Sequence, residues 1–85
     1  MPRTALESLS ALALDVWRYG LTDMMANALA VHERMELLTG ASYEAAAVSR
    51  ALRELESAGW CRRCMFGFKR AREHSEGATT LKMPL

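Results

Sequence analysis

Apolar side chains recur every three or four residues over most of the first 58 residues of this chain, and this spacing is typical of one face of an α-helix. The pattern is interrupted at Gly20 and Gly40 and stops at Gly59. We expect these glycines to end helices, because glycine readily adopts the left-handed conformation found there. The pattern therefore predicts three helices, over residues 5 to 18 or 19, from a cap at residues 22–23 to residue 38, and over residues 43–58.

Polar residues suited to helix N-termini precede each of these segments. Thr4 and Glu7 have the spacing of a capping box. Thr22 and Asp23 can cap the second helix, and Ser42 can cap the third. The second segment carries apolar residues on more than one face, so we expect it to be the central and most buried helix.

The last third of the chain has a different pattern. Residues 60–68 are predicted to form a strand with imperfect alternation, residues 69–77 a polar connection, and residues 78–83 a second, threonine-rich strand that ends at Pro84. Two strands joined in this way form an antiparallel hairpin. The predicted fold class is mainly α with a C-terminal β-hairpin, in a single domain spanning residues 1–85.

Composition agrees with a small helical protein. A chain of 85 residues suits one domain, which at this size buries only ~60% of its unfolded surface. Hydrophobic residues make up 51% of the chain and aromatic residues only 7%, a balance that favours helices over an all-β fold. No apolar run approaches the ~20 residues of a membrane span. The N-terminus lacks the layout of a secretory signal, so we expect a complete cytoplasmic protein.

Charge is distributed unevenly along the chain, although the net charge is only +1. Residues 1–44 carry three basic and six acidic side chains, whereas residues 45–85 carry eight basic and four acidic ones. The densest basic run contains no acid and consists of Arg62, Arg63, Lys69, Arg70 and Arg72. This asymmetry indicates an anionic partner on one side of the molecule. A hairpin tip kept soluble by its charge is the alternative, and the two carry equal weight.

The most informative stretch is residues 48–60. Val48, Leu52 and Leu55 share one helical face, arginines lie off that face, and a glycine separates the helix from a strand. This stretch resembles the recognition helix and the start of the wing in the winged helix-turn-helix family of bacterial and phage transcriptional regulators. Members of that family typically show a Val-Ser-Arg-x-Leu run and an Ala-Gly turn before the first wing strand. The resemblance covers residues 42–83, and the first two helices fit by arrangement only.

The resemblance implies a three-helix winged helix-turn-helix that binds double-stranded DNA. The third helix would enter the major groove with Ser49, Arg50 and Arg53 facing the bases, where arginine suits bidentate contact with guanine. The hairpin would lie along the backbone or minor groove. Its phosphate contacts would come from Arg62, Arg63, Lys69, Arg70 and Arg72. A homodimer with two half-sites is the implied binding unit, and no cofactor is expected.

Three features depart from that family's pattern. The turn at residues 39–42 is longer than usual, and Glu36 stands where a small residue is expected. Glu44, at the start of the third helix, would repel phosphates. These features suit a winged helix converted to protein binding. The alternative function is therefore a non-catalytic protein-binding module, or a phage-encoded inhibitor that occupies the nucleic-acid channel of a host complex.

Cys61 and Cys64 form a Cys-x-x-Cys pair that, with His74 and His32, could in principle ligate zinc. A single pair within a strand is a weak signal, because strand alternation places the two cysteines on opposite faces. We therefore favour two free thiols and no metal.

The remaining reactive or adaptable side chains are interpreted as structural. We expect the methionines to fill the core rather than to line an adaptable binding surface. We expect Trp17 and Trp60 to be core anchors. Carboxylates on the helices have no nearby partner for acid-base or nucleophilic chemistry, so the protein is predicted not to be an enzyme.

Overall fold

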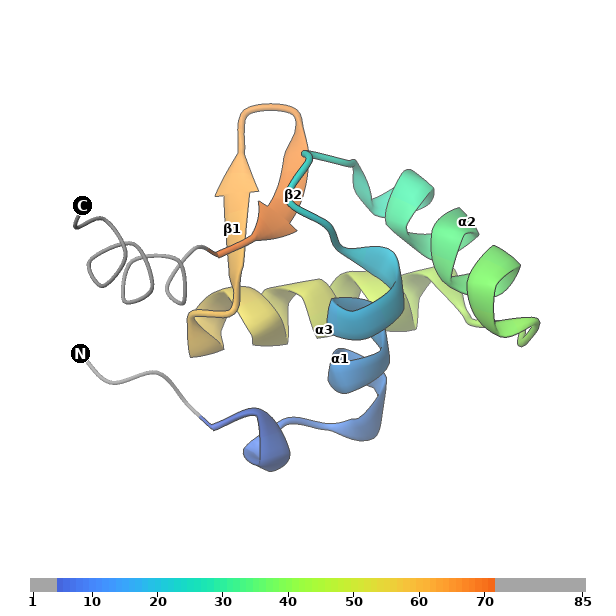
Figure 1. Ribbon diagram of the computed structural model, residues 1–85, viewed down its shortest axis with the longest axis horizontal. Helices are drawn as coiled ribbons and strands as arrows, with labels where there is room; N and C mark the ends of the chain where they lie inside the picture. The colour runs from blue at the N-terminus through green and yellow to red at the C-terminus, as the bar shows by residue number, and fades with distance from the viewer. Residues whose placement is uncertain (1–4, 72–85) are drawn as a thin grey trace, which may run out of the picture.

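The computed structural model describes residues 5–71 (Figure 1). This part of the chain forms three helical segments followed by a hairpin, so the predicted order of elements is confirmed. The elements are the 3-10 turn η1 (Leu6–Ser8), α1 (Ala11–Asp15), the π-helical turn η2 (Val16–Gly20), α2 (Ala28–Thr39), α3 (Ala45–Ala58), β1 (Cys61–Cys64) and β2 (Gly67–Arg70).

The first helix begins later than its apolar pattern predicts. Ser10 is its N-cap, with the hydroxyl oxygen accepting a hydrogen bond from the Ala13 N–H at 3.1 Å. The preceding turn η1 is separate, and Thr4 of the expected capping box lies outside the described residues. The helix continues directly into η2, so it consists of a short α-helical and a short π-helical part.

Gly20 ends the first helix, as expected, but for a different physical reason. Its backbone is not in the left-handed region, unlike Gly40 (φ 75°) and Gly59 (φ 89°), which end α2 and α3 as predicted. A Cβ atom at Gly20 would lie 2.6 Å from Val31 Cγ1 and 3.0 Å from Met35 Cγ. The absence of a side chain thus allows η2 and α2 to pack closely.

The second helix also begins later than predicted. Asn27 rather than Thr22 or Asp23 is the N-cap, and its Oδ1 accepts from the Ala30 N–H at 2.8 Å. Residues 21–27 form no helix, and among them Ala26 pairs with Phe68 of β2 through both backbone groups, at 2.8 and 2.9 Å. The expected cap at Thr22 or Asp23 is therefore wrong, and the helix begins at Ala28.

The hairpin lies wholly within residues 61–70, which the sequence divided between one strand and a loop. Its antiparallel register pairs Cys61 with Arg70 and Cys64 with Gly67, and residues 65 and 66 connect the strands. Gly67 allows the sheet to meet residue 26, because a Cβ atom there would lie 2.5 Å from the Ala26 carbonyl oxygen. The predicted strand at residues 78–83 lies outside the described residues.

The core is organised around α3, and the expectation that the second helix is the most buried is wrong. From α3, Val48, Ala51, Leu52 and Leu55 are buried. In α2 only two residues, Val31 and Met35, are buried. The reason is positional, since α3 packs against both the first helix and the hairpin.

The two tryptophans meet where these elements join. Trp60 is buried and Trp17 is half-buried, and their rings pack edge to face with centroids 5.6 Å apart. Their expected role as core anchors is consistent with this contact, which links the first helix to the segment after α3.

Candidate nucleic-acid interface

The solvent-facing side of α3 carries the two arginines that sequence analysis placed in a DNA groove. Arg50 and Arg53 are exposed, and Ser49 beside them is half-buried. The opposite side of the helix is buried in the core, so its packing fixes which residues face outward. The helical period of 3.6 residues places Ala46 and Ser57 on the same outer side, where neither adds charge.

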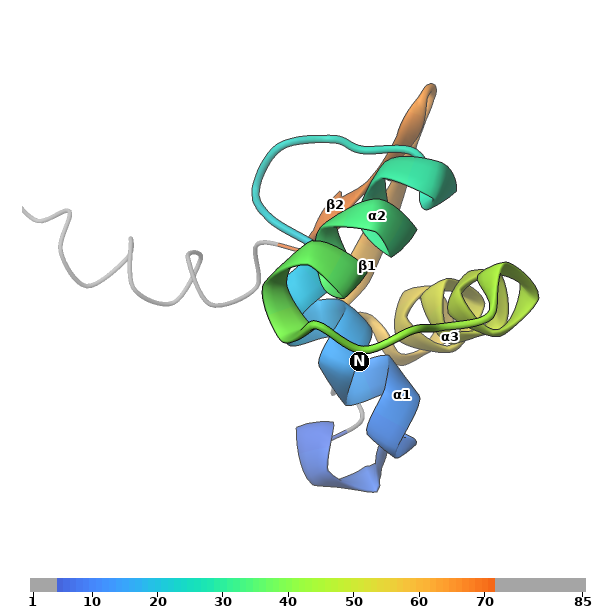
Figure 2. The ribbon, with the colours of Figure 1, turned by 90° about the vertical axis from the view of Figure 1, so that its right-hand side faces the viewer.

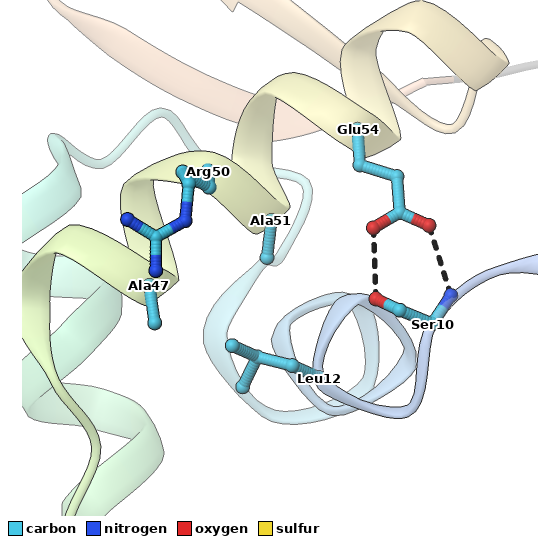
Figure 3. A pocket seen from close by; sticks show the side chains of 6 residues that line it. All are labelled: Ser10, Leu12, Ala47, Arg50, Ala51 and Glu54. Atoms are coloured by element: carbon cyan, nitrogen blue, oxygen red, sulfur yellow. Dashed lines mark hydrogen bonds between the residues drawn. The ribbon is translucent and has the colours of Figure 1, made fainter.

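The two acidic side chains within α3 do not share this outer face. Glu54 turns toward the first helix, where its carboxylate accepts hydrogen bonds from the N–H and the hydroxyl of Ser10, each at 2.8 Å (Figure 3). Glu56 turns toward the hairpin and pairs with Arg63 at 3.1 Å. Its hydrogen bond raises the pKa of the Arg63 guanidinium. Both carboxylates thus have hydrogen-bond partners within the protein, and Arg63 also balances the charge of Glu56. The exposed Arg50 and Arg53 make the outer face of α3 positive.

The cations of the hairpin divide between its two faces. Arg62 lies directly opposite Lys69, so these two side chains share the face that points away from the core. No ion pair involving either side chain is present among residues 5–71. Because neither side chain has an acidic partner there, the pair leaves positive charge on the outer face. Like charges directly opposite one another also destabilise a sheet.

Arg70, on the inner face, serves the fold. Its guanidinium donates to the Trp17 carbonyl oxygen from Nη2 (2.9 Å) and Nε (3.3 Å), and from Nη2 to that of Arg18 (3.3 Å). It also lies over the Trp17 ring, 4.5 Å from the centroid. These contacts join the hairpin to the end of the first helix.

Arg63 is the second cation of the inner face. Besides its pair with Glu56, its guanidinium lies over the Phe68 ring, 5.0 Å from the centroid. Sequence analysis assigned both Arg63 and Arg70 to phosphates, but each already has partners within the protein. Arg72 lies outside the described residues.

α3 and the hairpin are neighbours in the fold. In Figure 2 the tip of the hairpin points upward and α3 extends to the right below it, and both lie away from the loop that precedes α2. The Glu56–Arg63 pair connects them directly. The structure therefore brings α3 next to the hairpin, with Arg62 and Lys69 on the strand face opposite to the one that carries Arg63.

A shallow depression lies between the first helix and α3, lined by Ser10, Leu12, Ala47, Arg50, Ala51 and Glu54 (Figure 3). The Arg50 side chain points away from Glu54 in this view. The hydroxyl of Ser10 and the carboxylate of Glu54 are both engaged in capping the first helix. Neither group is available as a nucleophile or base without releasing the cap.

The turn before α3 is held by a network that sequence analysis did not foresee. Glu36 Oε2 accepts a hydrogen bond from the Tyr43 N–H at 2.8 Å. His32 Nε2 donates to the Tyr43 carbonyl oxygen at 2.6 Å and lies 3.4 Å from the same Glu36 oxygen. The Tyr43 hydroxyl donates to Thr39 Oγ1 at 3.3 Å. Glu36, which departs from the family's pattern, thus positions the start of α3. Neither Ser42 nor Glu44 makes a side-chain cap there.

Both cysteines are free thiols, as predicted. Cys61 is buried, and this burial raises the pKa of its thiol to about 12. Cys64 is half-buried and lies on the other face of β1. Within residues 5–71, no group of three or more His, Cys, Asp or Glu side chains is arranged to hold a metal ion, and His74 lies outside that range.

Several methionines are exposed, contrary to the expectation that they fill the core. Of those described, only Met35 is buried, whereas Met24, Met25 and Met65 are exposed. Met65 is 86% exposed and Phe66 beside it 73%. Other large apolar side chains exposed on α2 are Leu29, Leu37 and Leu38.

Comparisons of the chain with protein-family models, with curated proteins and with solved structures found no match. None of the helices within residues 5–71 combines the length and apolar character that a bilayer span requires.

Proposed function

We propose that the protein binds double-stranded DNA as a small winged-helix regulator, with α3 in the major groove and the hairpin beside it. The observation that carries the proposal is the outer face of α3. It presents Arg50 and Arg53, while the two acids within the helix are turned aside, with Glu54 hydrogen-bonded to Ser10 and Glu56 paired with Arg63. A helix that directs its acids inward and its arginines outward suits a polyanion.

The hairpin adds a second, sequence-independent contribution. Arg62 and Lys69 on its outer face are the cations best placed to contact phosphates. Each neutralised phosphate adds roughly 0.9 to the slope of log affinity against log salt concentration. Two arginines on one helix make a small base-reading surface, so a homodimer on two half-sites is the proposed binding unit.

Fluorescence polarisation with a random-sequence duplex tests the proposal. We expect binding at about 20 mM salt that weakens steeply toward about 200 mM. Replacing Arg50 and Arg53 together by alanine should remove most of the affinity and the sequence preference. Arg34→Ala is the matched control, because Arg34 is an exposed arginine on α2 rather than on α3 or the hairpin. Absence of binding at low salt, or equal losses in the control, would contradict the proposal.

The second candidate function is a protein-binding module, including a phage-encoded inhibitor that occupies a nucleic-acid channel. The exposed leucines of α2 favour it, since Leu37 is 82% and Leu29 64% exposed. One variant distinguishes the two functions. Leu37→Ser should leave duplex binding unchanged if DNA is the ligand of α3, and it should reduce partner capture if α2 is the docking surface.

A further inference from the structure

The tip of the hairpin carries side chains that neither the turn nor the core requires. Met65 and Phe66 form the two-residue connection, and both are largely exposed. Such connections usually contain Asn, Asp or Gly, because the favoured turns need positive φ angles. Here neither residue has a positive φ. In Figure 1 the tip projects beyond the body of the protein. Two large apolar side chains are thus presented to solvent without a structural reason.

The tip is flanked by positive charge. Arg62 precedes it and Lys69 follows it, whereas Arg63 is paired with Glu56, and residues 61–70 contain no acid. A shallow hollow beside the tip is lined by residues of the hairpin together with Asn27 and Ala28 at the start of α2. An apolar tip flanked by cations matches a partner whose surface is anionic and whose interior is apolar. A DNA duplex has this arrangement, because its stacked bases lie between two phosphate backbones.

We infer that the tip acts as a wedge, with Phe66, and Met65 beside it, inserting between neighbouring base pairs of a DNA duplex. This inference rests on the proposed function and adds a mode of action to it. Apolar wedges enter from the minor groove, unstack one base step and kink the duplex. Arg62 and Lys69 hold the flanking phosphates. The protein therefore bends DNA as well as reading it.

The position of the tip is compatible with this action. Both α3 and the hairpin tip lie away from the loop that precedes α2 (Figure 2), and the inference requires a duplex with α3 in its major groove to meet the tip with an adjacent groove. The hairpin is also anchored at two points, by the Ala26–Phe68 pairing and by the Arg70–Trp17 hydrogen bonds. These two attachments hold the hairpin in place while its tip inserts into the duplex. Flexible pyrimidine–purine steps cost least to kink, so the wedge favours a TA or CA step.

The test measures bending and unstacking separately from binding. A duplex of about 30 base pairs carries a fluorophore at each end and 2-aminopurine at a central TA step. With the wild-type protein we expect shortened end-to-end distance and a several-fold rise in 2-aminopurine fluorescence. The Met65→Ala, Phe66→Ala double variant should lose both signals and keep affinity within about tenfold. Phe66→Leu should retain part of the kink, and Leu37→Ser is the control for loss of an exposed apolar side chain.

The outcomes separate the inference from the proposed function. Tight binding to a duplex that stays straight and stacked overturns the wedge and leaves the proposed function intact. No duplex binding overturns both. Vesicles of anionic phospholipid form a parallel arm, and tip-dependent binding to them without kinking of the duplex assigns the tip to a membrane surface and overturns the wedge. Circular dichroism of each variant verifies that its fold is unchanged.

Discussion

Replacing Arg70 by alanine is expected to destabilise the fold rather than to remove a DNA contact. The guanidinium joins β2 to the end of the first helix, through hydrogen bonds to the carbonyl oxygens of Trp17 and Arg18 and through its position over the Trp17 ring. Alanine removes all of these contacts at once. Lysine retains the charge but lacks the planar fork that reaches two carbonyl groups, so Arg70→Lys should rescue little of the loss.

The magnitude follows from the contacts that disappear. Hydrogen bonds to a charged group contribute roughly 1.5–3 kcal/mol where they are shielded from water. Arg70 is only half-buried, so the lower part of that range applies. The cation–π contact adds about 0.5–1 kcal/mol. Together these give a loss of about 2–3 kcal/mol in the free energy of unfolding, which for a domain of this size lowers Tm by roughly 8–24 °C.

Thermal and urea unfolding followed by circular dichroism measure this loss. The matched control is Arg62→Ala, because Arg62 is exposed on the outer face of the same hairpin and should change the free energy of unfolding by no more than about 0.5 kcal/mol. In duplex binding we expect the reverse order, with Arg62→Ala weakening affinity and Arg70→Ala having little effect once the folded fraction is taken into account. Equal stability of Arg70→Ala and the wild type would refute the structural role assigned to Arg70.

Three further perturbations test the packing, capping and burial described above. Gly20→Ala should lower the free energy of unfolding by about 1–3 kcal/mol, because the new methyl group would lie 2.6 Å from the nearest core carbon; chemical denaturation measures it, and an unchanged midpoint would contradict the close packing. Glu54→Ala should cost about 1–2 kcal/mol by removing the carboxylate from Ser10, and Glu54→Gln should cost less; equal losses in both would argue against the hydrogen-bonding geometry. In a Cys64→Ser background, the free energy of unfolding should fall as pH rises from 9 toward 12, because the Cys61 thiol has a pKa near 9.0 in the unfolded chain and about 12 in the folded protein. Unfolding measured as a function of pH, with Cys61→Ala as the control, checks this sign.

Local signals predicted the order of the elements well. The glycines that end α2 and α3 act within their own turns, so Gly40 and Gly59 could be assigned from sequence alone. The start of α2 could not, since it depends on the pairing of Ala26 with Phe68, far along the chain. The sequence also predicted the turn of the hairpin at the wrong residues. Its turn residues, Met65 and Phe66, carry none of the usual turn chemistry.

The candidate site divides in the same way. The helical period alone places Arg50 and Arg53 outward, because the apolar residues of α3 recur at the spacing of one helical face. The periodicity does not reveal that Arg70 reaches Trp17 across 53 residues. Nor does it show that Glu36 holds the turn before α3. Charge counted along the chain therefore overstated the number of cations free to meet a ligand, since some have internal partners.

The pairing of Ala26 with Phe68 also bears on how this scaffold could be redesigned. Both hydrogen bonds are made by main-chain atoms, so the attachment of the hairpin does not depend on which side chains occupy its end. New peptide sequences could be grafted at residues 65 and 66 while the glycine at position 67 is kept. The same framework would then display different loops in one fixed orientation beside α3.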